Sequence, residues 1–477
     1  MKRMKQTKYI GRSREGFSRA AVLLSRLMGL FLLVMGWNSC TDFVEVEPPK
    51  NVLVSGTVFD DPATVESALA NIYYRIREQG MVSGNEGMTL LMGVYADELD
   101  YYGFDTGYAG FYNHTVLGGN DVVLAWWSHA YNLIYAANDI LIGVMDSSVL
   151  TTEEKNRYMG QALFVRAYMH GLLANLFGDI PYITTTDYRI NNEVSRMPLL
   201  EVYGMMVKDL NDAMVLLDGL EQNTSERVLP DKDVAKALLA RTYLYMEEWE
   251  LAVSLSSELL EAYDLEPDVE HVFLRTSSET LWQLKPGDSP RNTQEANQLV
   301  IQFIPGQSYA LTNVLLEAFE PGDLRYVHWV GSQSNTDSTV TLYYAHKYKA
   351  LFSEMESLEY PILFRLAEQY LIRAEARAHI GNLSGSQEDI NALRNRAGLS
   401  NTMATTQDGL MDAIVQERRV ELFAELGHRW FDLKRTESAG QVLGPLKVNW
   451  RASDVLLPIP ENELEANPNL APQNEGY

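Results

Sequence analysis

Hydrophobic side chains recur every three or four residues along most of the chain, which is the spacing of amphipathic helices. The first such stripe follows Asp61-Pro62, a typical helix start, and includes Val65, Leu69 and Ile76. The same spacing predicts further helices at about 121–146, 153–177, 199–217, 231–247, 249–263, 361–380, 384–396 and 407–426.

Neighbouring helices are separated by short connections, which predicts helix pairs. In the pair at 231–267, small and aromatic residues such as Ala240, Tyr243, Trp249 and Ala252 follow a spacing similar to that of a tetratricopeptide hairpin. The other pairs match less well, and no strict repeat continues along the chain. The predicted fold class is therefore mainly α, with irregular tetratricopeptide-like helical hairpins that carry a loop-rich region with short strands.

The loop-rich region lies between about 268 and 358, where Gly, Pro, Ser, Thr and Asn become frequent. Strand-like stretches occur there at 280–284 and 339–344. Residues 80–120 are also expected to be rich in loops. We expect these parts to pack on a helical scaffold formed by about 61–265 and 360–435, all within one domain at 61–477.

Charge is distributed unevenly along the 477 residues. The chain has 39 Lys and Arg against 64 Asp and Glu, a net charge of -25, which argues against a nucleic-acid partner. Residues 1–39 nevertheless contain eight basic residues and one acidic residue. Without them, the balance is 31 to 63, a net charge of -32. A basic head on an acidic body is typical of a targeting segment.

The end of this segment predicts a lipid anchor. Leu27–Trp37 is an apolar run of 11 residues, too short to span a bilayer, which needs about 20. Ser39 then precedes Cys40, the only cysteine, as at a bacterial lipoprotein cleavage site. We therefore predict a signal peptide at 1–39 and a lipidated tether at 40–60, with acylation of Cys40 anchoring the protein. The alternative is ordinary signal-peptidase cleavage with an incidental cysteine.

Enzymatic motifs are scarce. The sequence contains no phosphate-binding loop, dinucleotide fingerprint or nucleophile elbow, and its eight histidines are scattered. Glu368 and Glu375 lie on one helix face about 10 Å apart, but nearby arginines (365, 373 and 377) make ion pairs the favoured interpretation. The charged cluster at 417–432 is interleaved with apolar residues and is also interpreted as structural. We predict no catalytic residue, metal or cofactor.

The segment 95–112 is unusually aromatic. It holds seven aromatic residues in 18, where the chain average of 10% predicts about two, together with several carboxylates and no Lys or Arg. Aromatic faces beside hydrogen-bond acceptors suit sugar rings, although the rings could instead fold back into the core. The candidate ligand contacts are Asp97, Tyr101, Tyr102, Phe104, Asp105, Tyr108, Phe111 and Tyr112, with Trp329 as a weaker candidate in a loop of the 268–358 region.

Several blocks of the sequence, in order, carry a family resemblance. The strongest are FRLAEQYLIRAEARAHIGNLSGSQEDINALRNRAG at 364–398 and DAIVQERRVELFAELGHRWFDLKR at 412–435, with further matches at 158–183, 207–217 and the C-terminal 458–477. Over nearly all of the mature sequence, the chain resembles the SusD/RagB family of outer-membrane nutrient-binding lipoproteins.

This resemblance implies a non-enzymatic protein at the cell surface, anchored in the outer membrane by lipid. Family members act as lids of SusC-like, TonB-dependent transporter barrels and pass oligosaccharides inward. The resemblance implies that region 268–358 lies on the ligand side and that 95–112 is the loop after the first helices. Two alternatives remain open, a lid of the same type that captures peptides and, less favoured, a surface glycoside hydrolase.

Overall fold

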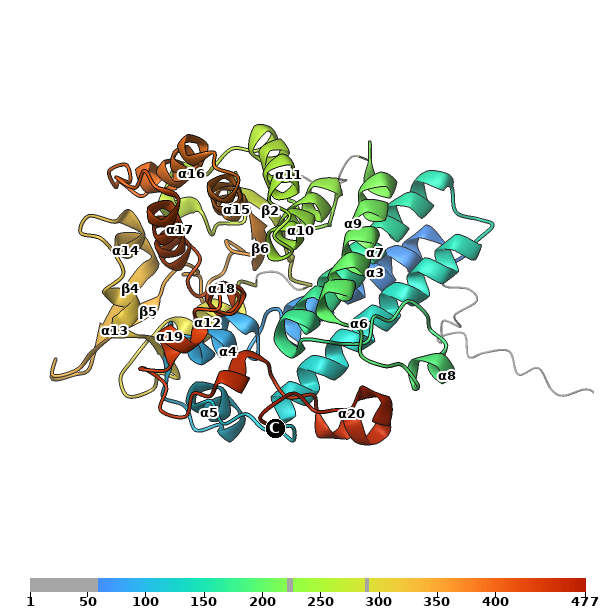
Figure 1. Cartoon of the computed structure of the whole chain (residues 1–477), viewed down its shortest axis with the longest axis horizontal. Coiled ribbons are helices and arrows are strands. Elements are labelled where there is room, and N and C mark those ends of the chain that lie inside the picture. The colour runs from blue at the N-terminus through green and yellow to red at the C-terminus, as the bar shows by residue number, and fades with distance from the viewer. Residues whose placement is uncertain (1–58, 221–225, 288–290) are drawn as a thin grey trace, which may run out of the picture. The chain divides into compact units, whose positions relative to one another are not determined.

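The structure is a computed structural model that describes residues 59–220, 226–287 and 291–477. Helices dominate these residues (Figure 1), which confirms the predicted fold class. The predicted signal peptide, Cys40 and all but the end of the predicted tether lie outside the described residues, so these remain predictions.

Long helices form the N-terminal part of the scaffold. Several of them begin at side-chain caps. For example, Asn120 accepts hydrogen bonds from the Val122 and Val123 amides, and Thr151 forms a reciprocal capping box with Glu154. The helices are α3 (Pro62–Glu78), α4 (Met88–Tyr95), α5 (Thr106–Asn113), α6 (Asp121–Asp146), α7 (Thr152–Phe177), α8 (Tyr188–Asn191) and α9 (Leu199–Leu217). Helix α7 contacts α3, α6 and α9, so it is buried on almost all sides.

Helix pairs continue the scaffold in the C-terminal half. These are α10 (Lys232–Tyr245), α11 (Trp249–Ala262), α15 (Leu366–His379), α16 (Leu383–Arg396), α17 (Gln407–Glu421) and α18 (His428–Arg435). Helix α10 packs on α11, α11 on α15, and α15 on α16 and α17. The Trp249 ring stacks on His379, with 3.9 Å between the ring centroids. The pair α10–α11 therefore matches the predicted hairpin and joins the last helices through an aromatic contact.

Two predicted helix boundaries are wrong. The helix predicted at 361–380 begins only at Leu366, because the preceding residues pair with another strand. The helix predicted at 407–426 ends at Glu421, since Ala424, Leu426 and Gly427 have left-handed backbone conformations with φ of 50°, 47° and 73°. The left-handed turn ends α17 before α18 starts at His428.

Three two-stranded antiparallel sheets hold the loops in place. They pair β1 (Leu99–Tyr101) with β3 (Tyr309–Leu311), β2 (Thr280–Gln283) with β6 (Ile362–Arg365), and β4 (Val330–Ser334) with β5 (Thr341–Ala345). The strands expected near 280–284 and 339–344 are confirmed. The short helices are α12 (Gln294–Leu299), α13 (Asn313–Leu316), α14 (Leu324–Trp329), α19 (Ala439–Leu443) and α20 (Glu461–Ala466), with 3₁₀ turns at Val269–His271, Ala452–Val455 and Pro468–Leu470.

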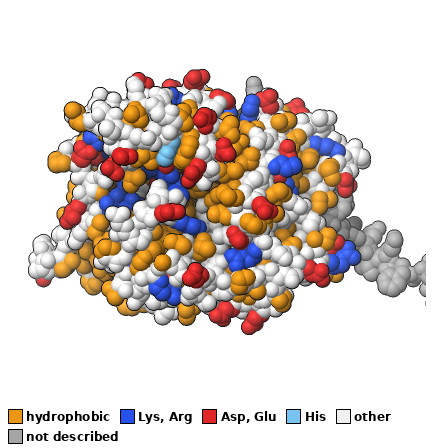
Figure 2. Space-filling model, in the orientation of Figure 1, with side chains coloured by type: hydrophobic (Ala, Val, Ile, Leu, Met, Phe, Trp, Pro, Cys, Tyr) orange, Lys and Arg blue, Asp and Glu red, His pale blue; other side chains and the backbone are white. Residues whose placement is uncertain are grey.

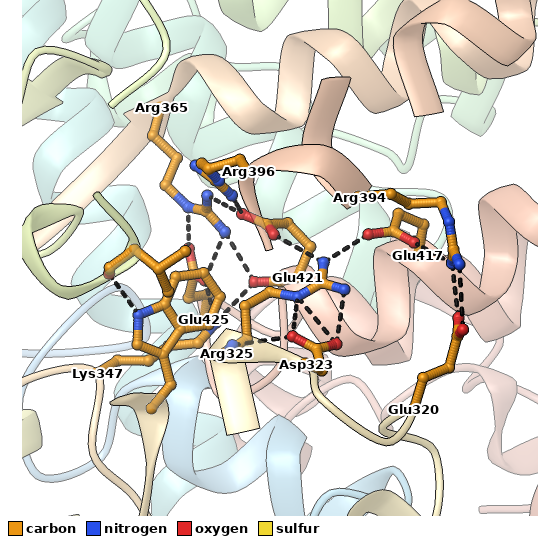
Figure 3. A network of polar contacts seen from close by, with 12 residues as sticks. Glu320, Asp323, Arg325, Lys347, Arg365, Arg394, Arg396, Glu417, Glu421 and Glu425 are labelled. Atoms are coloured by element: carbon orange, nitrogen blue, oxygen red, sulfur yellow. Dashed lines mark hydrogen bonds and ion pairs between the residues drawn. The ribbon is translucent and has the colours of Figure 1, made fainter. Parts of the chain in front are cut away.

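A buried ion-pair network joins the loop region to the last helices (Figure 3). Arg325 binds Asp323, Glu417 and Glu421, all almost fully buried. Arg365 also reaches Glu421, at 2.6 Å. Burial would raise the pKa of Glu421, but the surrounding arginines outweigh it and hold the pKa well below its usual range. These contacts confirm the structural interpretation of the 417–432 cluster.

The Glu368 and Glu375 carboxylates are structural as well, but their partners differ from those expected. Arg241 binds Glu368 with two hydrogen bonds of 2.6 and 2.7 Å, and Arg435 binds Glu375. The nearby arginines at 365, 373 and 377 instead reach carboxylates on other elements. Tertiary packing therefore favours distant partners over neighbours on the same helix.

Candidate functional site

The aromatic segment 95–112 is fixed at its base by a strand and a helix. Strand β1 pairs with β3, so that Tyr101 lies opposite Tyr309. Helix α5 then begins at Asp105, whose carboxylate accepts a hydrogen bond of 2.9 Å from the Tyr108 amide. Residues 80–120 are rich in loops, as expected, but α4, β1 and α5 also lie there. These elements were not predicted because glycines and a short strand interrupt the hydrophobic periodicity of the segment.

Three tyrosines of the segment are half-buried and have fixed hydroxyl groups. The Tyr101 hydroxyl accepts from the Asp105 amide at 3.0 Å, and its ring centroid lies 5.5 Å from that of Tyr309. Tyr108 donates to Glu86 and Tyr112 to Asp100, at 3.2 and 3.1 Å. Burial, followed by the neighbouring carboxylates, raises the pKa of Tyr108 and brings that of Tyr112 to about 12. Both hydroxyls are therefore neutral donors at physiological pH.

Two rings project into solvent. Tyr102 is 42% exposed and Phe104 is fully exposed. A large apolar ring gains nothing from full exposure in the free protein, so Phe104 offers an open face to a ligand. Asp105, beside them, is exposed too, although one carboxylate oxygen already caps α5.

Three of the predicted contacts lie instead in the interior. Phe111 is fully buried between Tyr95 and Trp126. Asp97 is 2% exposed and belongs to the lining of a cavity beside Tyr112, but its carboxylate is bound by two arginines of the C-terminal scaffold. Trp329 lies at the end of α14, buried, with its indole N–H donating to the Val269 carbonyl at 2.9 Å. The sequence analysis left open whether such residues pack into the core, and the structure shows that these three do.

Two cavities flank the segment, and distant parts of the chain complete them. One, of about 460 Å³, lies beside Tyr108 and includes Glu86, His129 and Gln294. The other, of about 360 Å³, lies beside Tyr112 and includes Asp100, Asn313, Lys447 and Asn449 in its lining. Sequence reasoning missed His129, Gln294, Asn313, Lys447 and Asn449 because they lie outside 95–112 in the chain and carry no motif.

Lys447 changes the electrostatic picture of the site. The segment itself contains no base, but the Lys447 ammonium lies 4.3 Å from the centre of the Tyr112 ring and donates to the Val94 carbonyl at 2.8 Å. Burial lowers the pKa of Lys447 to about 8. The lining of the second cavity therefore contains a basic side chain as well as the carboxylate of Asp100, and the site is less acidic than its sequence suggested.

The arrangement provides ring faces, amides, carboxylates and hydroxyl donors at one surface, which suits recognition of a polyhydroxylated ligand. Within the described residues, no group of three or more His, Cys, Asp and Glu side chains converges to hold a metal ion. On the face drawn in Figure 2, Lys and Arg side chains are scattered among Asp and Glu. No helix in the described part of the chain is both long and apolar enough to cross a membrane.

Two family models match the chain. One, described as starch-binding and associating with the outer membrane, matches residues 42–244, and the SusD family model matches residues 315–477. The curated SusD-like protein P2 of Formosa agariphila is 26% identical over 509 residues, which cover 94% of this chain and 98% of the relative.

Solved structures share the fold. A SusD superfamily protein from Bacteroides vulgatus has a TM-score of 0.78 at 21% identity, covering 88% of this chain and 100% of that structure. Surface glycan-binding protein A from Bacteroides thetaiotaomicron, in complex with laminarihexaose, has a TM-score of 0.73 at 19% identity, covering 86% and 99%. With one model on each half of the chain and relatives that match it almost from end to end, the protein belongs to the SusD/RagB family.

Proposed function

We propose that this protein binds oligosaccharides at the cell surface, as the lid of a TonB-dependent, SusC-like transporter of the outer membrane. The observation that carries glycan binding is the pair of exposed rings at Tyr102 and Phe104, in a segment whose Tyr108 and Tyr112 line two polar cavities. The family match and the laminarihexaose complex of a structural neighbour support this ligand class.

Binding would combine stacking with hydrogen bonds. The C–H face of a sugar ring packs on Tyr102 or Phe104, and its hydroxyls exchange hydrogen bonds with groups such as Glu86, Asp100 and Asn449 that line the two cavities. Because Tyr108 and Tyr112 are held by carboxylates, the platform is largely formed before the ligand arrives. Asp97, Phe111 and Trp329 are structural supports in this proposal.

The lid role and the outer-membrane location by lipid attachment at Cys40 rest on the family and on the sequence of the first 40 residues. In this proposal the loops hold the sugar while helix pairs contact the barrel. Purification of the lipidated protein from outer membranes is expected to bring a barrel transporter with it. A protein that leaves the membrane fraction alone, with Cys40 unmodified in mass spectra, would contradict this part of the proposal.

Peptide capture is the second candidate, favoured by the exposed carboxylate of Asp105 beside Phe104. Carboxylates would meet the charged amine or basic side chains of a peptide, so moderate salt should weaken binding strongly. Binding of an uncharged glycan should be nearly indifferent to salt. A hydrolase is not supported by the paired carboxylates at 368 and 375, because an arginine holds each one.

Removal of the two exposed rings tests glycan binding directly. The Tyr102→Ala/Phe104→Ala variant should keep its fold and lose roughly 1–3 kcal/mol of binding free energy, the range of a hot-spot aromatic. Tyr101 is left in place because its hydroxyl and ring support the loop. The matched control is Leu200→Ala/Val215→Ala, which removes two exposed apolar side chains from α9.

Affinity electrophoresis against a polysaccharide panel would identify the ligand, and calorimetry with the matching oligosaccharide would give the affinities. Unchanged affinity of the ring variant, or equal losses in the variant and the control, would remove the segment 95–112 from the binding site.

A further inference from the structure

A third cavity, of about 440 Å³, lies away from the aromatic segment, between α6, α8 and the C-terminal α20. These three elements approach one another in the lower right of Figure 1. Trp127, Tyr131 and Tyr135 line it from α6 at four-residue intervals, and Tyr188 lines it from α8. We call this cavity the α6–α8 cleft. Four aromatic residues in one cavity give it the ring surface of a carbohydrate site.

The floor of the α6–α8 cleft is fixed by hydrogen bonds from the scaffold. The Tyr131 hydroxyl donates to the Pro181 carbonyl at 2.9 Å. Ile183 is held at both backbone groups, since its amide donates to His170 Nε2 at 3.0 Å and its carbonyl accepts from Asn138 at 3.0 Å. Because these residues are already held in place, the floor of the cleft loses little conformational entropy when a ligand binds, which favours binding.

The rim of the cleft is open and apolar. Tyr135 is 48% exposed and Tyr188 is 70% exposed. Both rings line the cavity, so each presents a face to its contents as well as to solvent. Two exposed tyrosines at the mouth of a preformed cavity match the way in which sugar-binding surfaces place rings around a ligand.

The polar side chains of the cleft are amides, hydroxyls and one carboxylate. Asn191 donates from its amide nitrogen to the Thr185 carbonyl at 2.8 Å, but its Oδ1 atom is buried and has no hydrogen-bond partner among the described residues. Asn132 and Asn192 add further amides, and Glu463 adds the carboxylate. No Lys or Arg belongs to the described lining. A buried acceptor without a donor is costly, and a ligand hydroxyl would complete it.

We propose that the α6–α8 cleft is a second binding site for a neutral oligosaccharide. One sugar ring stacks between Tyr135 and Tyr188, and a ligand hydroxyl donates to Asn191 Oδ1. The choice of glycan as the ligand class rests on the proposed function, but the site is built from different elements. On α6, Ala125 and His129 line the cavity beside Tyr108, whereas Trp127, Tyr131 and Tyr135 line this one.

The test uses the mature full-length protein with laminarihexaose, cellohexaose and maltohexaose at millimolar concentration. Hydrogen–deuterium exchange should show protection of residues 187–194 with at least one of these probes. The Tyr135→Ala/Tyr188→Ala variant should lose that protection and bind the same probe at least about tenfold more weakly in calorimetry. Tyr135→Phe/Tyr188→Phe keeps both ring faces and should retain most of the affinity.

Comparison with Tyr102→Ala/Phe104→Ala separates this inference from the proposed function. Losses in the cleft variant, with or without losses in the loop variant, support the second site. If only the loop variant loses affinity and 187–194 stays unprotected, the cleft inference is overturned while the proposed function stands. Absence of binding to all three probes at millimolar concentration would overturn the second site, and failure across a wider polysaccharide panel would overturn glycan binding as well.

Discussion

Asp97 connects the base of the aromatic segment to the C-terminal scaffold. Its replacement by Asn tests whether the residue supports the fold or contacts the ligand. The Asp97 carboxylate accepts from Arg429 Nε at 2.7 Å and Nη2 at 3.0 Å, and from Arg419 Nη2 at 2.7 Å. Asp97→Asn keeps the shape of the side chain but removes its charge and one acceptor oxygen. Two arginines on α17 and α18 would then face a neutral amide.

The expected cost follows from the burial of this cluster. Breaking a buried ion pair by removing one partner costs about 3–5 kcal/mol, because the remaining charge stays desolvated. Asn retains one acceptor, and Arg419 is partly exposed, so we expect a loss near the lower end, about 3 kcal/mol of unfolding free energy. Phe104 and Tyr102 are untouched. Molecules that remain folded should therefore bind the glycan with unchanged affinity.

Urea unfolding of the wild type, Asp97→Asn and the control Asp412→Asn, an exposed carboxylate on α17, gives the stabilities. The pH dependence gives a second check. Burial alone would raise the pKa of Asp97, but the hydrogen bonds and charges of Arg429 and Arg419 outweigh it and lower the pKa below 3.8. The wild-type advantage should therefore be complete above pH 3.8 and decline as the pH falls through the lowered pKa. A variant of normal stability with weakened glycan binding would refute this reasoning and return Asp97 to the ligand site.

Two further predictions concern the scaffold. Burial lowers the pKa of His170 from 6.5 to about 3, so between these pH values only the unfolded chain binds a proton at this residue. The free energy of unfolding should therefore fall on acidification by about 1.4 kcal/mol per pH unit because of His170. His170→Gln should reduce the measured slope by that amount, and an unchanged slope would contradict the assignment. Gly427→Ala should lower the free energy of unfolding by about 2 kcal/mol, because φ is 73° and the new Cβ would lie 2.9 Å from Met92 Cβ. The control Gly204→Ala, whose new Cβ meets no described atom within 4 Å, should be neutral or stabilising by up to about 1 kcal/mol. Equal melting temperatures for the two variants would refute the strain argument.

The long helices could be predicted because their signals are local. The helix at 121–146 was bounded correctly by its hydrophobic stripe, and so was the one at 199–217. Strand β6 was missed because its residues are fully buried and continue the apolar pattern of the next helix. Only its pairing with β2, some 80 residues earlier, distinguishes strand from helix there. The hydrophobic periodicity of a segment does not indicate which distant segment it will pair with.

The candidate site could be located from the sequence but not resolved into individual contacts. An aromatic excess at 95–112 is visible in composition, yet it does not separate Phe104 from Phe111, one fully exposed and the other fully buried. That difference depends on the start of α5, which turns one ring outward and the other toward Trp126. Lys447 was beyond reach for the same reason, since only the folded chain brings it to Tyr112.

The segments that identify the family and those that offer ligand contacts have different physical tasks. The blocks at 364–398 and 412–435 supply Arg365, Arg396 and Glu421, whose buried ion pairs with Glu279 and Arg325 fix the last helices to the loop region. Such residues tolerate little change, because loss of one partner leaves a desolvated charge. Phe104 pays no comparable penalty when it is replaced, since it contacts mainly solvent. Ligand preference can therefore change at the exposed rings while the scaffold, and with it the family resemblance, stays the same.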